Sequence, residues 1–148
     1  MDIRQALKQY TSLRDEKDEV ERRIRKLEKA LERITEEGEV KDSVKGGYGG
    51  TQHFVIEGFP LTEFSDVRSA LQKQKLRLTA LQKELIEACD TAHEFINSVS
   101  DSEIRRILTF RYIYGYSWDK TARSMGHRAT EDAVRMRARL FFEKNSEK

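Results

Sequence analysis

The sequence predicts an all-α fold: a long antiparallel helical (coiled-coil) hairpin with a small loop or β-hairpin insert, followed by a C-terminal helix-turn-helix. Three observations predict it. The 148 residues include one proline and are 36% charged, which favours long solvated helices over a sheet-rich fold. Apolar residues recur in alternating steps of three and four along most of the first hundred residues. Beyond residue 100, shorter helical patterns are separated by glycines, so we expect two domains, residues 1–99 and 100–148.

The first hundred residues predict two long helices. The apolar stripe of the first begins at Ile3, is interrupted at Lys17 and ends at Ile34. The second keeps the rhythm throughout, and its seam positions are Phe64, Val67, Leu71, Gln74, Leu78, Leu81, Leu85, Ala88, Ala92, Phe95 and Val99. A seam of this length is typical of coiled coils. The two helices most simply fold back on each other, but the same seam fits a second copy of the chain. We therefore expect a homodimer, with Gln74 as a polar residue that fixes the register.

Residues 38–63 are predicted to connect the two helices. The glycines of 46–50 form a flexible turn, and residues 52–56 have strand propensity, with residues 40–44 as the candidate partner strand. A phosphate-cradling glycine loop is disfavoured, because no Lys-Ser or Lys-Thr pair follows the glycines. We interpret the connector as a flap or a partner-binding arm.

Three short helices are predicted after residue 100. The first begins at a capping box, Ser100-Asp-Ser-Glu103, in which the Ser100 hydroxyl accepts from the helix N-terminus. It ends at Gly115, which takes a left-handed conformation at no side-chain cost. Ser117 is the expected N-cap of the second helix, and Gly126 ends it.

The third helix is predicted to have two chemically distinct faces. Thr130 caps it, and the acidic residues of its first turn suit the helix dipole. The apolar back consists of Val134, Ala138 and Phe141, with Phe142 nearby. The polar front consists of Asp132, Arg135, Met136 and Arg139. Such a helix packs on supporting helices while its front enters a major groove, where Arg bridges a guanine edge or a phosphate and Asp accepts from cytosine.

These helices resemble region 4 of bacterial sigma-70 factors. The shared pattern is Leu-x-x-Arg-Tyr ending at Tyr112, then Gly-x-Ser ending at Ser117, an acidic residue, Ala122 and a closing glycine. Residues 130–137 resemble the start of the family's recognition helix. The type that they resemble most is the small sigma-like regulators of phages and prophages (ArpU-like proteins). Residues 45–60 also resemble the interhelical insert of those regulators.

The resemblance implies a DNA-contacting face. Carried over by position, it falls on Glu131, Asp132, Arg135 and Met136. With the neighbouring polar side chains, the expected DNA-binding set is Arg128, Thr130, Glu131, Asp132, Arg135, Met136 and Arg139. Two departures from the family pattern are a longer turn at residues 127–130 and Thr121 where an apolar residue is common. The chain has no recognisable sigma region 2, which disfavours a full sigma factor.

Composition agrees with a DNA-binding protein rather than an enzyme. Residues 101–148 hold 11 Lys/Arg and 7 Asp/Glu, giving +4, whereas residues 1–100 hold 17 and 19, giving −2.

No catalytic or metal-ligand spacing occurs, so we expect no cofactor, no metal and no small-molecule substrate. The lone Cys89 indicates a reducing compartment, and no apolar run is long enough for a membrane span. We expect a cytoplasmic protein of a bacterial cell or phage-infected host.

The predicted function is sequence-specific binding of double-stranded DNA by a phage or prophage transcriptional regulator. The coiled coil would set the oligomeric state or hold a partner such as RNA polymerase. One alternative is a small terminase-like subunit for DNA packaging, because such subunits also join a helix-turn-helix to oligomerising helices. Another is a protein-interaction adaptor whose helix-turn-helix does not bind DNA. Arg105 and Arg106 are equally compatible with DNA-backbone contacts and with ordinary exposed helix charges.

Overall fold

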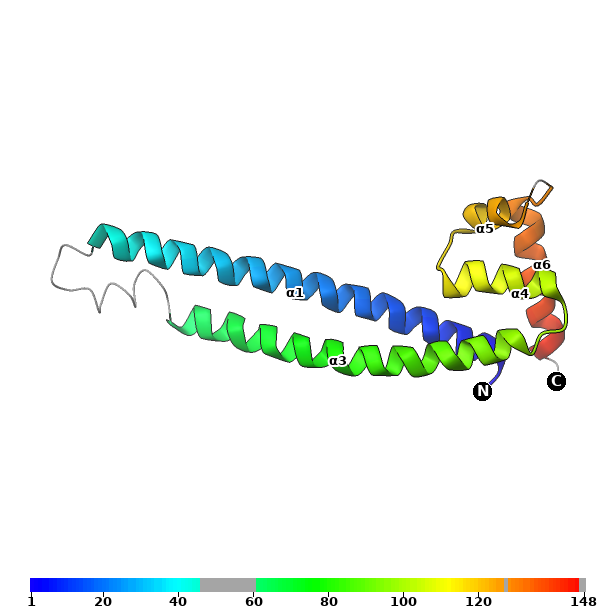
Figure 1. The fold of residues 1–148 in the computed structure, drawn as a ribbon, viewed down its shortest axis with the longest axis horizontal. Helices are drawn as coiled ribbons and strands as arrows, with labels where there is room; N and C mark the ends of the chain where they lie inside the picture. The colour runs from blue at the N-terminus through cyan, green and yellow to red at the C-terminus, as the bar shows by residue number, and fades with distance from the viewer. Residues whose placement is uncertain (46–60, 127, 147–148) are drawn as a thin grey trace. The chain divides into compact units, whose positions relative to one another are not determined.

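The computed structural model of the chain describes residues 1–45, 61–126 and 128–146. For residues 38–45 and 61–63 it describes the helical backbone but not the side chains. The elements are α1 (Ile3–Lys45), α3 (Leu61–Asn97), α4 (Ser102–Leu108), the π-helix η1 (Thr109–Ile113), α5 (Trp118–Met125) and α6 (Glu131–Ser146) (Figure 1). The described ranges contain helices and turns but no strand, which confirms the all-α prediction for them.

The chain divides into two compact units, which we describe separately. Unit 1 comprises residues 1–16 and 82–148, and unit 2 comprises residues 17–81. The apolar core of unit 1 therefore includes the start of α1 and the end of α3, as well as the helices after residue 100. The predicted domain boundary at residue 100 does not coincide with this division, because side chains from both sides of residue 100 share one core.

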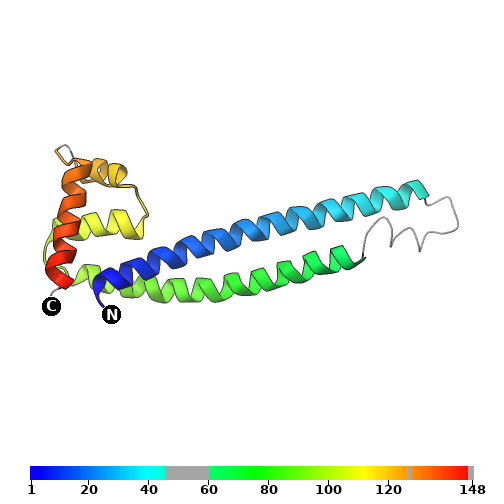
Figure 2. The same ribbon diagram turned by 180° about the vertical axis from the view of Figure 1, so that it is seen from behind.

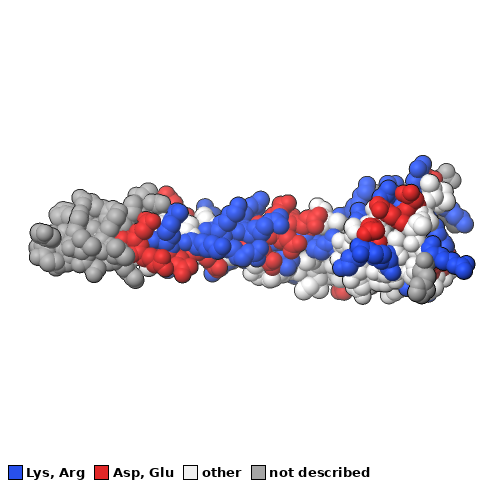
Figure 3. Space-filling view, turned by 90° about the horizontal axis from the view of Figure 1, so that it is seen from above, with Lys and Arg blue, Asp and Glu red and all other residues white. Residues whose placement is uncertain are grey.

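In unit 2, α1 and α3 lie side by side and run in opposite directions (Figure 1, Figure 2). Five of the predicted seam residues of this unit are buried: Val20, Ile24, Ile34, Leu71 and Leu81. The others are only partly buried: Leu27, Leu31, Phe64, Val67 and Leu78. Lys75 Nζ lies 3.6 Å from Glu28 Oε1, an ion pair between the two helices. Basic and acidic side chains mix on the visible surface of this unit (Figure 3), as expected for helices that are solvated on their outer sides.

Polar residues interrupt the seam of unit 2 at two places. Lys17 pairs with Glu21 at 2.9 Å, one helical turn further along α1. The Oε1 atom of Gln74 is buried and has no hydrogen-bond partner among the described residues. An unpaired buried amide oxygen is costly, so Gln74 is a weak point of the isolated unit.

The connector is shorter than the sequence predicts. Residues 38–45 continue α1, and residues 61–63 begin α3, so the predicted connector over 38–63 is wrong at both ends. Residues 40–44 are helical, which contradicts their expected role as a strand. The strand propensity of two valines is weak and depends on context, and here continuation of a long helix prevails. The remaining part of the predicted insert, residues 46–60, lies outside the described residues.

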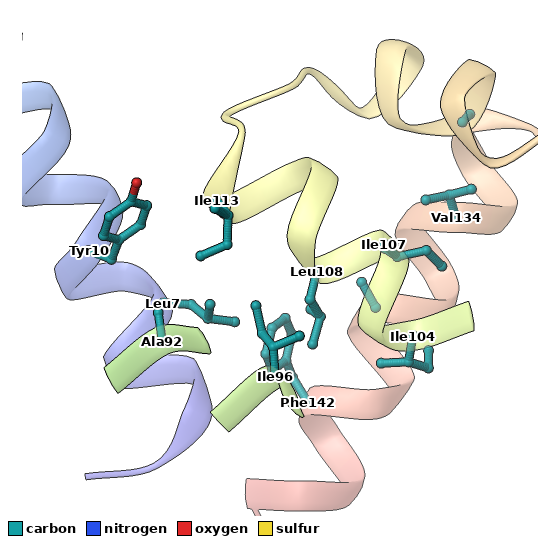
Figure 4. Close-up of a cluster of buried hydrophobic side chains, with 12 residues drawn as sticks. Leu7, Tyr10, Ala92, Ile96, Ile104, Ile107, Leu108, Ile113, Val134 and Phe142 are labelled. Carbon is teal, nitrogen blue, oxygen red and sulfur yellow. The ribbon is translucent and has the colours of Figure 1, made fainter. Parts of the chain in front are cut away.

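The core of unit 1 joins all of its helices. Figure 4 shows Leu7 and Tyr10 of α1 beside Ala92 and Ile96 of α3, with side chains of α4, η1 and α6 completing the cluster. Its other members are Ile104, Ile107, Leu108, Ile113, Ala122, Val134, Ala138 and Phe142. This core fixes the orientation of α6, because one side of that helix packs into it.

The start of α4 differs from the predicted capping box. Asp101, not Ser100, is the N-cap, and its Oδ1 accepts hydrogen bonds from Glu103 N at 2.8 Å and Ile104 N at 3.3 Å. The predicted cap was one residue too early. An Asp and a Ser are equally good caps in this position, and the path of the backbone after α3 selects Asp101.

The segment after α4 widens into a π-helix before it turns. Tyr114 N donates to Thr109 O at 3.0 Å, which is the spacing of a π turn. Gly115 follows with φ of 72°, so its predicted left-handed conformation is confirmed. Arg14 of α1 donates from Nη1 to the carbonyl oxygens of Tyr112 at 3.0 Å and Ile113 at 3.1 Å. These contacts tie α1 to the turn that precedes α5.

Candidate nucleic-acid interface

A short turn joins α5 to α6, and a side-chain cap begins each helix. The Ser117 hydroxyl accepts a hydrogen bond of 3.1 Å from Lys120 N, and the Thr130 hydroxyl accepts one of 3.2 Å from Ala133 N. Helix α5 ends at Gly126, whose φ of 124° is one that L residues rarely adopt. These three predicted boundaries are confirmed. His127, in the same turn, lies outside the described residues.

All the residues predicted to contact DNA are exposed. Helix α6 carries Glu131, Asp132, Arg135, Met136 and Arg139, which we call the α6 outer face. Arg128 and Thr130 precede it in the turn and are also exposed. The opposite side of α6 is buried through Val134, Ala138 and Phe142, whereas Phe141, predicted for the back of the helix, is partly buried. The two predicted faces of the helix are therefore present.

The arginines of the α6 outer face are paired with acids of the same helix. Arg135 Nη2 forms a hydrogen-bonded ion pair with Glu131, and its Nη1 lies 4.0 Å from Asp132 Oδ1. Arg139 Nε donates to Glu143 Oε1 at 2.8 Å, and this hydrogen bond, with the charge of Glu143, raises the pKa of Arg139 above its ordinary value. Such exposed pairs contribute little to stability, so an incoming anion can replace the acids at small cost.

Arg105 and Arg106 make contacts that stabilise the fold. Arg105 Nη1 donates to Val99 O at 2.6 Å and to Ser100 O at 3.0 Å, and so closes the bend between α3 and α4. The Arg106 guanidinium lies 5.9 Å from the ring centroid of Phe110. These contacts give both arginines a role within the fold, which neither the DNA-backbone nor the exposed-charge interpretation of the sequence includes.

Arg137, which no pattern in the sequence singles out, links α6 to α4. Arg137 Nη2 donates to Asp101 Oδ2 at 3.2 Å, and Arg137 Nη1 pairs with the Glu103 carboxylate. The same carboxylate group of Asp101 therefore caps α4 and holds α6. Spacing offered no signal for this contact, since the partners are 36 residues apart.

The departure from the family pattern at Thr121 has a structural counterpart. Thr121 lies in α5 and is fully buried, and its Oγ1 has no hydrogen-bond partner among the described residues. A hydroxyl in this position costs desolvation without a compensating bond. The expectation that an apolar residue suits this position is therefore consistent with its surroundings.

Three further observations bear on the class of protein. No family model, curated protein or solved structure matches the chain. Among the described helices, none has the length and apolar character that crossing a membrane requires. The same part of the chain holds no group of three or more His, Cys, Asp or Glu side chains placed to bind a metal ion. The arrangement of α5 and α6 is thus the main basis for a functional proposal.

Proposed function

We propose that the chain is a sequence-specific DNA-binding protein, a phage or prophage transcriptional regulator. In this proposal α5, the turn and α6 act as a helix-turn-helix similar to sigma-70 region 4. Helix α6 enters the major groove of double-stranded DNA, and the paired helices α1 and α3 form a coiled-coil hairpin that sets the oligomeric state or holds RNA polymerase. The protein works by binding and not by catalysis.

One observation carries the proposal. The seven residues expected to contact DNA are all exposed, while Val134, Ala138 and Phe142 hold the opposite side of α6 in the core of unit 1. A recognition helix needs this division, because it must be rigidly supported and yet offer a full face to base edges.

The ion pair between Arg135 and Glu131 on α6 must open when Arg135 binds a DNA base. To donate both guanidinium nitrogens to a guanine, Arg135 has to leave Glu131, which is one turn earlier on the same face. The released carboxylate can then accept from a cytosine amino group. Arg128 lies before the helix and is better placed for a phosphate than for a base.

The test is a comparison of two arginine variants on selected DNA. Duplexes bound by the intact chain are first selected from a random-sequence library, and the best site and a scrambled duplex are then titrated at several salt concentrations. Arg135→Ala should cost about 1–3 kcal/mol on the selected site and relax base preference there. Arg128→Ala should weaken binding equally on both duplexes. It should also lower the magnitude of the salt slope, the slope of log K against log salt concentration, by about 0.9.

The outcomes separate the candidate functions. If no duplex is enriched and neither variant differs from the wild type, α6 does not read DNA. If DNA binds with specificity but the chain forms closed rings in light scattering, a terminase-like packaging role replaces the regulatory one.

A protein-binding adaptor is the second candidate, because apolar side chains are exposed on α6. Met136 is 48% exposed and Leu140 is 54% exposed, although both are large and apolar. Exposed apolar side chains of this size are common at protein interfaces. If the chain is an adaptor, the wild type should bind a protein partner with little dependence on salt and should not shift DNA. Met136→Ser and Leu140→Ser should abolish binding to that partner.

We also propose that the chain forms a homodimer through the seam of α3. Leu78 and Leu85 are only partly buried, and the Gln74 amide oxygen has no partner among the described residues. A second copy would cover the leucines and could pair the two Gln74 amides, as polar seam residues do in coiled coils. The wild type should sediment as a dimer at micromolar concentration. The double variant Leu78→Asp, Leu85→Asp should no longer have the mass of a dimer, or it should unfold. An unchanged mass and melting curve would contradict a dimer that forms through this seam.

A further inference from the structure

A cationic hollow lies beside the α6 outer face in unit 1. It has a volume of about 290 Å³ and is lined by the first turn of α1, the π-helix, the first residue of α5 and one side of α6. Its lining residues are Arg4, Tyr112, Trp118, Arg135, Ala138, Arg139, Phe142 and Glu143. Three of them are arginines and one is a glutamate, so the hollow carries a net positive charge of two.

Aromatic rings line the hollow beside the arginines. Tyr112 and Phe142 meet edge to face with ring centroids 5.8 Å apart, and the Arg4 guanidinium lies 5.6 Å from the Phe142 ring centroid. Burial raises the pKa of the Tyr112 phenol above its ordinary value.

We propose that this hollow binds a phosphodiester of the DNA backbone, with Arg4 and Arg139 as its guanidinium ligands. Guanidinium groups match the geometry of phosphate oxygens and can donate in pairs, and the aromatic rings that line the hollow suit the C–H groups of the adjoining deoxyribose. Arg135 and Arg139 also belong to the α6 outer face, so a duplex lying on that face would bring its backbone to the hollow. The inference rests on the proposed function and extends it to residue 4, at the opposite end of the chain.

Arg4 is the discriminating residue, because it belongs to neither α5 nor α6. The matched variants are Arg4→Gln, which removes the charge while keeping much of the length, and Arg4→Lys, which keeps the charge. Lys83→Gln is the control, since it removes one positive charge from an exposed position of α3 in unit 1 that does not line the hollow. Melting curves of all variants establish that they are folded under the binding conditions.

Trp118 provides a direct readout, because it lines the hollow and is the single tryptophan of the chain. Full-length protein is titrated with a selected duplex, a scrambled duplex and thymidine 5′-monophosphate, and both affinity and Trp118 fluorescence are followed. Arg4→Gln should weaken binding roughly fivefold on either duplex at about 0.15 M salt and lower the salt slope by about 0.9. Arg4→Lys should recover most of the affinity, and Lys83→Gln should behave as the wild type. Duplex should change the fluorescence of the wild type more than that of Arg4→Gln.

Three results overturn the inference, and they are distinguishable. If the wild type binds a selected duplex and Arg135→Ala loses specificity while Arg4→Gln keeps the wild-type affinity and salt slope, Arg4 makes no phosphate contact and the proposed function stands. If the mononucleotide changes Trp118 fluorescence at the concentrations at which duplex does, and Arg4→Gln does not affect duplex binding, the hollow takes free phosphate esters instead. Absence of any duplex binding by the wild type removes the proposed function and this inference together.

Discussion

Arg14 and Gly115 are in such close contact that a Cβ atom at Gly115 would lie 2.8 Å from the guanidinium carbon of Arg14. Gly115 has a φ of 72°, and its lack of a side chain lets Arg14 reach the carbonyl oxygens of Tyr112 and Ile113. The first helix is thereby fixed to the end of the π-helix. The turn into α5 depends on a side chain about a hundred residues earlier in the sequence.

Gly115→Ala should lower the free energy of unfolding for two reasons. The left-handed conformation costs an L residue about 1–2 kcal/mol, and the methyl group would also displace Arg14. Arg14→Ala should cost about 1.5–3 kcal/mol through its charged hydrogen bonds. Urea denaturation of both single variants and the double variant separates the effects. Gly115→Ala should cost less when Arg14 is already absent, and an equal cost in both backgrounds would show that the contact contributes nothing.

Thr121→Val should stabilise the protein by about 1 kcal/mol. Valine has nearly the shape of threonine, and it removes a buried hydroxyl that has no hydrogen-bond partner among the described residues. Thr109→Val is the control, because the Thr109 hydroxyl donates to Arg105 O at 2.7 Å. Thermal unfolding followed by circular dichroism should show a higher midpoint for the first variant only. A lower midpoint for Thr121→Val would indicate a partner for Oγ1 in solution.

Asp101→Ala should cost about 0.5–2 kcal/mol, the usual effect of removing an N-cap. The variant also removes one of the two carboxylates that Arg137 contacts. Ser100→Ala is the matched control, because only the backbone carbonyl of Ser100 takes part in a hydrogen bond that stabilises this bend. Chemical denaturation should show a loss for Asp101→Ala and almost none for Ser100→Ala. The reverse order would restore the capping box that the sequence suggests.

Leu81→Asp should destabilise unit 2 far more than Leu76→Asp does. Leu81 is fully buried and Leu76 is 73% exposed, although both are leucines of the same helix five residues apart. Burial of an unpaired carboxylate should cost about 3 kcal/mol or more, whereas an exposed substitution should change stability by about 0.5 kcal/mol or less. Hydrogen exchange of α3 amides measures the effect locally. Equal protection in the two variants would contradict the assignment of the seam.

Local patterns in the sequence determined which segments are helical and which of their sides are apolar. The spacing of Leu71 and Leu81 placed them inward, and the chemistry of Ser117, Thr130 and the two glycines set the limits of α5 and the start of α6, because caps and left-handed turns depend on neighbouring residues only. The polar side of α6 followed from helical periodicity in the same way. The sequence pattern failed at residues 38–45, which it assigned to the connector, with 40–44 as a candidate strand, although α1 continues through them.

Tertiary structure alone decided which distant side chains meet. The choice of Asp101 over Ser100 as N-cap depends on the backbone path out of α3, and both residues satisfy the same local rule. The contacts of Arg14 with the π-helix and of Arg137 with Asp101 join residues far apart in sequence, so no periodicity could predict them. The same holds for Arg4, which reaches the hollow beside α6 because the start of α1 shares the core of unit 1. A helical pattern fixes the direction of a side chain, but only the packing of helices fixes its neighbours.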